Sequence, residues 1–418
     1  MSFASFRRLL ARIGLLAALT AAGPAVAVGP PKKTDAAKPD AAPAIAAAVD
    51  VAVDGARTRF TVTLSKTVTA RAFPMERPDR LILDLPEVTF HLPNEARRAK
   101  EGLIASFRYG LFAPGRSRVV IDLVHPAQVA RLDVVPNAGD GSAQLVLELT
   151  KTDRDTFRKA AAEASAQARA TVEVPVPDAG SDRRPLIMLD PGHGGIDPGA
   201  AAAGMFEKDI VFSFAEALKR RLEKAGRYRV LMTRDHDVFV PLGDRVRIAR
   251  AARADLFISI HADSISGSQE VRGLTVYTGS ERASDADSAS LADRENRADA
   301  TAGVEAGEGP DEVLDILQDL TLRETRAFSH GFATRLVGEL DSVARLNKNP
   351  HRQAGFRVLR AHDVPSVLVE LGYLTSRKDF DLLVSDDWRD RAAGAMSTAI
   401  DRFFATRLAI QGPTPKAR

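Results

Sequence analysis

The chain has 418 residues, of which 45% are apolar and 27% charged, with a formal net charge of +3 and no cysteine. This length allows two or three domains, and the composition is that of a globular protein. So small a net charge gives no reason to expect a nucleic-acid partner. The lack of cysteine excludes disulfides, thiolate metal sites and a cysteine nucleophile, and it suits a protein that folds in an oxidising compartment.

Residues 1–27 have the pattern of a cleaved signal peptide. Arg7 and Arg8 precede a short apolar stretch at 9–23, and the small residues Ala25–Ala27 form a cleavage pattern. A membrane anchor is the alternative, but the stretch is short and Arg12 interrupts it. "SFRRLLA" loosely resembles a twin-arginine signal, so the Sec and Tat routes both stay open. The mature protein is expected to lack a membrane span.

A proline- and alanine-rich linker is predicted at 28–46, followed by an all-β domain at 47–150. Apolar and polar residues alternate there with a period of two, which predicts strands at 58–65, 79–86, 117–124 and 143–150. Such strands bury one face, so we expect a small sandwich. The domain has no cluster of histidine and acidic residues suited to catalysis. Residues 151–183 read as a second, partly helical linker.

Strand and helix patterns alternate in the third region, residues 184–410. This alternation predicts an α/β domain with a mostly parallel sheet and helices on both faces. Ligands of such sheets bind outside the carboxyl ends of the strands. Strands are expected at 186–190, 228–234, 255–260, 273–278, 356–360 and 366–371, and helices at 206–226, 242–254, 312–340 and 387–406.

Polar side chains that follow strands of this sheet are the candidates for catalysis. His193 and His261 come just after strands, Glu370 lies near the end of one, and Glu207 begins a helix. Two imidazoles and a carboxylate are a common ligand set for catalytic zinc. Asp190 and Asp263 are candidates for orienting these ligands. The glycines around His193 would let backbone and substrate approach the metal closely.

Other interpretations fit the same residues. A histidine after a strand is often structural, and Glu370 alone could be a buried salt-bridge partner. The "GHGG" loop could cradle a phosphate, although it lacks the GxGxxG and GK[ST] patterns. Arg245, Asn349 and Ser376 are further polar residues that could line a groove. Spacing alone leaves the zinc site and these alternatives open.

Four motifs, in order, resemble the zinc-dependent N-acetylmuramoyl-L-alanine amidases of the bacterial cell-division group, the AmiC/AmiB type. They are "IMLDPGHGGIDPGA" (187–200), "EKDIVF" (207–212), "FISIHAD" (257–263) and "VPSVLVELGYLTS" (364–376). The all-β region resembles the AMIN domain, which targets such enzymes to the cell wall. The resemblance implies zinc ligands at His193, Glu207 and His261, a catalytic carboxylate at Glu370, a peptidoglycan substrate and a periplasmic location.

The reaction implied by this resemblance is hydrolysis of the amide between the lactyl group of N-acetylmuramic acid and L-alanine. Zinc would lower the pKa of a water, and Glu370 would take its proton and return it to the leaving amine. A zinc peptidase that cuts the stem peptide elsewhere is one alternative. A wall-binding scaffold with an inactive domain is another, although the intact set of four residues argues against it.

An insertion at 280–311 is much longer than the usual connection in such a domain. Its middle, 289–304, resembles the regulatory helix of the cell-division amidases, and the family pattern ENxAD appears as "ENRAD". The resemblance implies that Glu295 closes the open zinc position and that a LytM-domain activator relieves the block. Glu281 and Glu305 are weaker candidates, and a solvated surface helix is the alternative. The ligand of the β domain and the oligomeric state stay open.

Overall fold

The computed structural model describes residues 42–92, 101–168, 182, 184–264, 272–304 and 316–411. The signal peptide predicted at 1–27 and residues 28–41 of the first predicted linker lie outside the described residues. So do most of 169–183 and the candidate Glu305.

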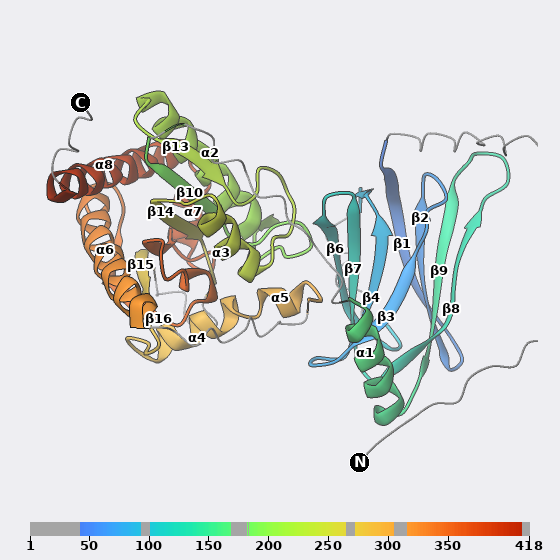
Figure 1. The fold of residues 1–418 in the computed structure, drawn as a ribbon. Coiled ribbons are helices and arrows are strands. Elements are labelled where there is room, and N and C mark those ends of the chain that lie inside the picture. The colour runs from blue at the N-terminus through green and yellow to red at the C-terminus, as the bar shows by residue number, and fades with distance from the viewer. Residues whose placement is uncertain are drawn as a thin grey trace, which may run out of the picture. The chain divides into compact units, whose positions relative to one another are not determined.

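The amino-terminal region is a sandwich of two antiparallel sheets, apart from one short parallel pair (Figure 1). One sheet has the order β5-β1-β2-β9-β8 and the other β3-β4-β7-β6. Alternate residues such as Phe60, Val62 and Leu64 of β2 point into the shared core, as the period-two pattern predicted. The strands are β1 (Ala44–Asp54), β2 (Arg57–Leu64), β3 (Arg71–Met75), β4 (Arg80–Pro86), β5 (Val88–Phe90), β6 (Ile104–Ala113), β7 (Arg116–Leu123), β8 (Ala127–Pro136) and β9 (Ala143–Lys151).

The helix α1 (Arg154–Ala168) follows the sandwich directly and packs against β3. Phe157 and Ala161, four positions apart, are buried, so one side of the helix is covered. The first part of the segment predicted as a partly helical linker at 151–183 is therefore a helix that packs on the β domain.

The carboxyl-terminal region is built on a six-stranded sheet with the order β13-β10-β14-β17-β15-β16. Neighbouring strands are parallel except for β15 and β17, which pair antiparallel, so the predicted mostly parallel sheet is confirmed. A separate hairpin joins β11 to β12. The strands are β10 (Leu186–Pro191), β11 (Ala201–Ala202), β12 (Met205–Phe206), β13 (Arg229–Met232), β14 (Leu256–His261), β15 (Leu274–Gly279), β16 (Leu346–Ala354) and β17 (Ser366–Glu370).

Helices cover both faces of this sheet, as Figure 1 shows. Successive residues of the central strands bury their side chains in opposite layers: Ile258 and Ile260 pack with α2, α6 and α8, and Phe257 packs with α3 and α4. Strands buried on both faces read as continuous apolar runs. The helices are α2 (Glu207–Ala225), α3 (Leu242–Ala251), α4 (Ala286–Glu295), α5 (Ala298–Thr301), α6 (Ile316–Leu340), α7 (Arg377–Leu383) and α8 (Asp386–Gln411).

Several elements were not predicted from the sequence, namely β1, β3, β5, β6, β8, β11, β12 and α7. Two further differences concern the six-stranded sheet and the layer beside it. The run at 356–360, predicted as a strand, is a single 3-10 turn, η2 (Arg357–Leu359). Its Phe356 and Val358 are buried in the layer beside α3, and a short apolar run does not distinguish a strand from another buried segment. The strand β16 was not predicted, because "LNKNPHRQA" is polar and lies at the edge of the sheet.

The insertion contains two short helices, α4 and α5. Asp285 caps the first, since its carboxylate accepts the backbone N–H of Ser288 at 2.8 Å. Leu291 and Ala292 are buried against the sheet's apolar layer, so this helix is not a fully solvated surface element.

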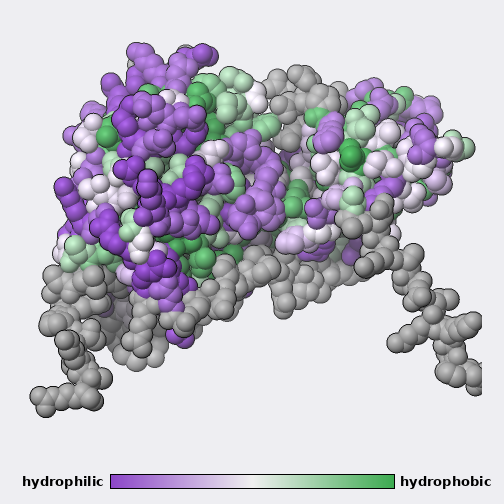
Figure 2. Space-filling model, turned by 90° about the horizontal axis from the view of Figure 1, so that it is seen from above, coloured by the Kyte–Doolittle hydropathy of each residue, from purple (hydrophilic) through white to green (hydrophobic). Residues whose placement is uncertain are grey.

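The face drawn in Figure 2 is mainly hydrophilic, with hydrophobic residues in small separate groups. No helix among the described residues is long and apolar enough to cross a membrane.

Candidate metal centre and active site

The parallel strands β10, β14 and β17 bring the candidate residues to one edge of the sheet. His193 lies two residues beyond β10, and His261 and Glu370 are the last residues of β14 and β17. His261 and Glu370 are direct register partners. Glu207 reaches the same edge because it is the first residue of α2. The rule that ligands gather at the carboxyl ends of parallel strands therefore describes this chain well.

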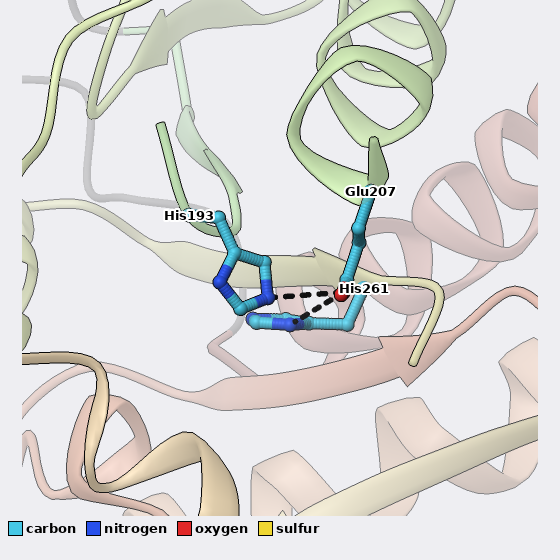
Figure 3. A group of neighbouring side chains, drawn as sticks. All are labelled: His193, Glu207 and His261. Carbon is cyan, nitrogen blue, oxygen red and sulfur yellow. Dashed lines mark hydrogen bonds and ion pairs between the residues drawn. The ribbon is translucent and has the colours of Figure 1, made fainter. Parts of the chain in front are cut away.

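The donor atoms of His193, Glu207 and His261 face one another (Figure 3). Glu207 Oε1 lies 3.1 Å from His193 Nε2 and 3.2 Å from His261 Nδ1. Two donor atoms on a tetrahedral zinc, each about 2.0–2.1 Å from the metal, would lie about 3.3–3.4 Å apart. This is the only group of three or more metal-binding side chains found among the described residues. The nitrogen and carboxylate donors, their spacing and their burial all fit a zinc ion.

An acidic residue holds the ring of His193 in this orientation. Asp197 Oδ2 lies 2.9 Å from His193 Nδ1, so the other ring nitrogen, Nε2, is the one that faces Glu207. An imidazole that binds metal through one nitrogen usually bonds a carboxylate or carbonyl through the other. Sequence reasoning missed Asp197, although an acidic residue four positions after His193 is visible in "HGGID".

Two backbone amides hold the carboxylate of Glu207. Ala262 N–H donates to Oε1 and Ala200 N–H donates to Oε2, both at 2.9 Å. Because Ala262 follows His261 directly, this hydrogen bond also ties one ligand segment to the next.

The two aspartates predicted to orient the ligands have other contacts. Asp190 is fully buried and bonds Thr233, Ser259 and Arg245, so it reaches His193 only through Arg245. Asp263 bonds Arg294 of α4 at 2.6 Å, and its backbone N–H donates to Glu370 Oε2 at 3.1 Å.

Of the three residues considered for a groove, Arg245 is 2% exposed and lies inside the domain, whereas Asn349 is in the edge strand β16. Ser376 caps α7, where its hydroxyl accepts the backbone N–H of Asp379.

Glycines leave room for the ligand side chains themselves. A Cβ on Gly192 would lie 2.4 Å from Cε1 of His261. A Cβ on Gly199, whose φ is +65°, would lie 2.7 Å from both Glu207 Oε2 and His193 Cδ2. The sequence analysis assigned the glycines around His193 to close approach of backbone and substrate, and the contacts show that Gly192 and Gly199 make room for the three candidate ligands.

Comparison with known proteins agrees with this geometry. The family model described as N-acetylmuramoyl-L-alanine amidase matches residues 187–402, and the AMIN domain model matches residues 48–149. The chain belongs to the N-acetylmuramoyl-L-alanine amidases. An amidase named AmiC from Neisseria meningitidis is 34% identical over 85% of this chain and 89% of its own length. AmiC from Escherichia coli is 32% identical over 83% of this chain and 87% of its own.

Solved structures of amidases also resemble the chain. Amidase AmiC2 of Nostoc punctiforme is 29% identical, with a TM-score of 0.37, and covers 54% of this chain and 99% of that one.

Glu370, the fourth residue of the candidate site, is fully buried. Burial raises the pKa of Glu370 well above its usual value, and the nearby carboxylates of Asp263, Glu207 and Glu295 raise it further. Its Oε1 has no hydrogen-bond partner. A buried carboxyl group with a raised pKa and a free oxygen is suited to accepting and returning a proton.

His193 and the carboxylate of Glu207 stabilise each other's charged forms. Burial lowers the pKa of His193, because it disfavours the charged imidazolium. The nearby carboxylates of Glu207, Asp197 and Glu295 have the larger combined effect and raise the pKa of His193 well above the usual value. Burial disfavours the charged form of Glu207 as well, but His193 and His261 lower its pKa well below the usual value. A divalent cation would satisfy the same carboxylates.

Helix α4 brings a further carboxylate to the amidase site. Glu295 Oε2 lies 3.3 Å from His261 Nδ1 and 3.6 Å from His193 Nε2, and the residue is 8% exposed. Burial and the carboxylates of Glu207 and Asp263 raise its pKa to about 7, against the lowering effect of the two histidines. Glu281, by contrast, has a 91% exposed side chain and pairs with Arg326.

Proposed function

We propose that this protein is an exported, zinc-dependent amidase that cleaves the bond between the lactyl group of N-acetylmuramic acid and L-alanine in peptidoglycan. The observation that carries the proposal is the convergence of His193, Glu207, His261 and Glu370 at one edge of the sheet. The family of the chain supports the choice of bond.

His193 Nε2, His261 Nδ1 and Glu207 Oε1 would hold the zinc ion. Bound there, zinc lowers the pKa of a water toward neutrality and polarises the amide carbonyl. Asp197 keeps Nε2 of His193 directed at the site, and the amides of Ala200 and Ala262 keep the Glu207 carboxylate in place.

Glu370 is proposed as the general base and then the general acid. It takes the proton of the attacking water and passes it to the nitrogen of the departing L-alanine, so the leaving group is a neutral amine. The unpartnered Oε1 supports this role because it is available to a water or a substrate. Burial and the neighbouring carboxylates raise the pKa of Glu370, so this carboxyl group holds a proton more readily than a free one, which suits a group that must keep a proton and return it.

The enzyme is proposed to be autoinhibited by α4. Zinc with three protein ligands keeps a fourth position for water or substrate, and a carboxylate in that position would close it. The distances from Glu295 Oε2 to the two ligand nitrogens support this placement.

Polar contacts on both sides of Glu295 fix α4 against the catalytic domain. Arg294 pairs with Asp263 at 2.6 Å, and Asp285 pairs with Arg352 at 3.4 Å. Asn296 donates to the carbonyl of Gly355 at 2.9 Å and accepts the N–H of Arg357 at 2.8 Å. Because these ion pairs and hydrogen bonds are few, a protein that binds α4 could break them and form new contacts with the helix. We propose that a LytM-domain activator does so.

The remaining parts of the chain are assigned by the resemblance. We propose that residues 1–27 direct export to the periplasm, by the Sec or the Tat route. The linkers predicted at 28–46 and 151–183 are shorter than expected, because β1 begins at Ala44 and α1 extends to Ala168; we propose that linkers before β1 and after α1 flank the AMIN domain. The amidase domain would span 184–410, with the regulatory insertion at 280–311. The AMIN domain would target the enzyme to the septal wall, where its activity would split the wall between daughter cells.

A digest of purified peptidoglycan tests the function. The chain from residue 28 onward, loaded with zinc and carrying Glu295→Ala, is incubated with the wall, and the products are identified by mass spectrometry. Free stem peptides that begin with L-alanine, and glycan strands with bare lactyl groups, are expected. Shortened stems still attached to glycan would mean a peptidase, and an intact wall together with tight wall binding would mean a scaffold. The double variant Glu295→Ala/Glu370→Ala is the matched inactive control.

A further inference from the structure

The segment that carries His193 is buried, and Gly192 and His193 belong to no helix or strand, so the carbonyl groups of these two residues need donors from elsewhere. Residues 192–196 are all buried. Buried backbone carbonyls without a partner are costly, and nearly all of them in proteins are hydrogen-bonded. In this amidase, two buried arginines supply the donors for the carbonyls of Pro191, Gly192 and His193.

Arg234, just after β13, joins the segments of two ligands. Its Nε donates to the carbonyl of Pro191 at 3.0 Å, and its Nη2 donates to the carbonyls of Gly192 at 3.0 Å and Lys208 at 2.9 Å. Gly192 precedes His193 and Lys208 follows Glu207. One guanidinium therefore sets the distance between the backbone that carries the first ligand and the backbone that carries the second.

Arg245, on α3, holds His193 itself. Its Nη2 donates to the carbonyl of His193 at 2.8 Å, and its Nη1 donates to the carbonyl of Pro191 at 3.0 Å and to Asp190 at 2.8 Å. The residue is 2% exposed, and Asp190, fully buried, neutralises it. The planar fork of an arginine can bond several acceptors at fixed angles, which a lysine cannot do.

The backbone of His193 needs such support. Its φ is +58°, in the left-handed region that residues other than glycine rarely adopt. A strained conformation of this kind persists only where its surroundings determine it. The two guanidinium groups, together with the Asp197 contact to the ring, provide these surroundings.

We propose that Arg234 and Arg245 are positioning residues that hold His193 and Glu207 in their metal-binding arrangement before the metal binds. This inference rests on the metal site proposed above. The arginines do not reach the metal or the substrate; they act through the backbone of the ligands. Loss of either guanidinium group should therefore weaken metal binding and alter the geometry of the metal site, while the sheet and helices of the domain are kept.

The test compares Arg234→Lys and Arg245→Lys with the parent in the chain from residue 28 onward. Arg247→Lys is the matched control, because Arg247 lies on the same helix as Arg245 but has a 44% exposed side chain. Zinc affinity is measured by competition with a chromogenic chelator, and the ligand field is measured by the visible spectrum of the cobalt-substituted proteins. A drop in zinc affinity of roughly 10–100-fold, the usual effect of losing an outer partner of a metal site, is expected for both variants. Their cobalt spectra should change as well, and the control should match the parent.

Other outcomes would overturn the inference. Zinc affinity within about twofold of the parent and unchanged cobalt spectra would show that the arginines do not position the ligands. If a lysine variant fails to fold, judged by near-ultraviolet circular dichroism, the glutamine variant at the same position, Arg234→Gln or Arg245→Gln, replaces it, since glutamine keeps one donor nitrogen. Failure of that variant too would mean that the guanidinium supports the fold rather than the ligands. A parent protein that binds no zinc would instead refute the metal site itself.

Discussion

The carboxylate of Glu295 lies against His261, with 3.3 Å between Oε2 and Nδ1. This relationship places a side chain of the 280–311 insertion beside the candidate metal ligands His193 and His261. Glu295 is 8% exposed, so solvent and substrate have little access to the space between this carboxylate and the two histidines. The contact joins two segments that are 34 positions apart in the sequence (295 − 261).

Replacing Glu295 by alanine should raise basal activity. A change of roughly tenfold or more is expected, because regulatory coupling energies are typically about 1–3 kcal/mol. Turnover is measured by release of dye-labelled wall fragments without an activator. Glu281→Ala is the control, since that exposed side chain lies in the same insertion and pairs with Arg326. Equal activity of Glu295→Ala and the parent would contradict the proposal that Glu295 blocks the site.

The ion pair between Arg294 and Asp263 should act as a latch for α4. Arg294→Ala is expected to raise basal activity about fivefold, since a partly exposed pair contributes up to about 1 kcal/mol. Arg297→Ala, an exposed arginine two residues beyond Glu295, should have no effect. In the Glu295→Ala background, removal of Arg294 should add nothing, because the site is already open. An additive gain there would contradict the latch.

Glu370→Ala should separate metal binding from catalysis. Because Glu370 is not among the three ligands, the variant should keep one equivalent of zinc, measured by plasma mass spectrometry. Turnover in the Glu295→Ala background should fall by roughly 10²–10⁴-fold, the usual contribution of a general acid–base group. Retained turnover would refute the role assigned to Glu370, and lost zinc would indicate that it is a ligand.

Asp197→Asn should weaken zinc binding by roughly 10–100-fold, because the carboxylate orients His193 and increases its basicity. Zinc affinity is measured by chelator competition. Asp235→Asn is a suitable control, since Asp235 also contacts a histidine, His236, but its side chain is 83% exposed. The Asp197 assignment fails if both variants bind zinc as the parent does.

Removal of the metal should lower the thermal stability of the catalytic domain. Zinc at about 1,000 times its dissociation constant contributes about 4 kcal/mol, which corresponds to roughly 10 °C in Tm for a domain of this size. Scanning calorimetry with zinc and with excess chelator gives the difference. His261→Ala should show almost no shift, because it lacks one ligand. A parent Tm that does not respond to chelator would argue against zinc at this site.

Much of the fold follows from local sequence patterns. The period-two alternation predicted β2, β4, β7 and β9, and the alternation of strand and helix predicted the mostly parallel sheet. The carboxyl-end rule then predicted that His193, His261 and Glu370 lie together. These features depend on residues close in sequence or on topology that is general to the fold class, so they could be predicted.

Other features depended on contacts between distant segments. The sequence did not indicate that Asp197 faces Nδ1 of His193, that Asp190 reaches the loop only through Arg245, or that Arg234 bridges the carbonyls of Gly192 and Lys208. Hydrogen bonds of this kind depend on side-chain directions, which are set when the loops pack. Packing between distant segments also explains why residues 357–359 form a 3-10 turn and not the predicted strand.

The order of the domains, the family and the residue types that can bind a metal could thus be predicted, because these follow from composition, periodicity and motif. Which donor atoms face one another, and the 3.3 Å between Glu295 Oε2 and His261 Nδ1, depend on how distant segments pack. The physical reason is that a metal site needs atoms placed within a few tenths of an ångström, and packing between segments far apart in the chain sets positions on that scale.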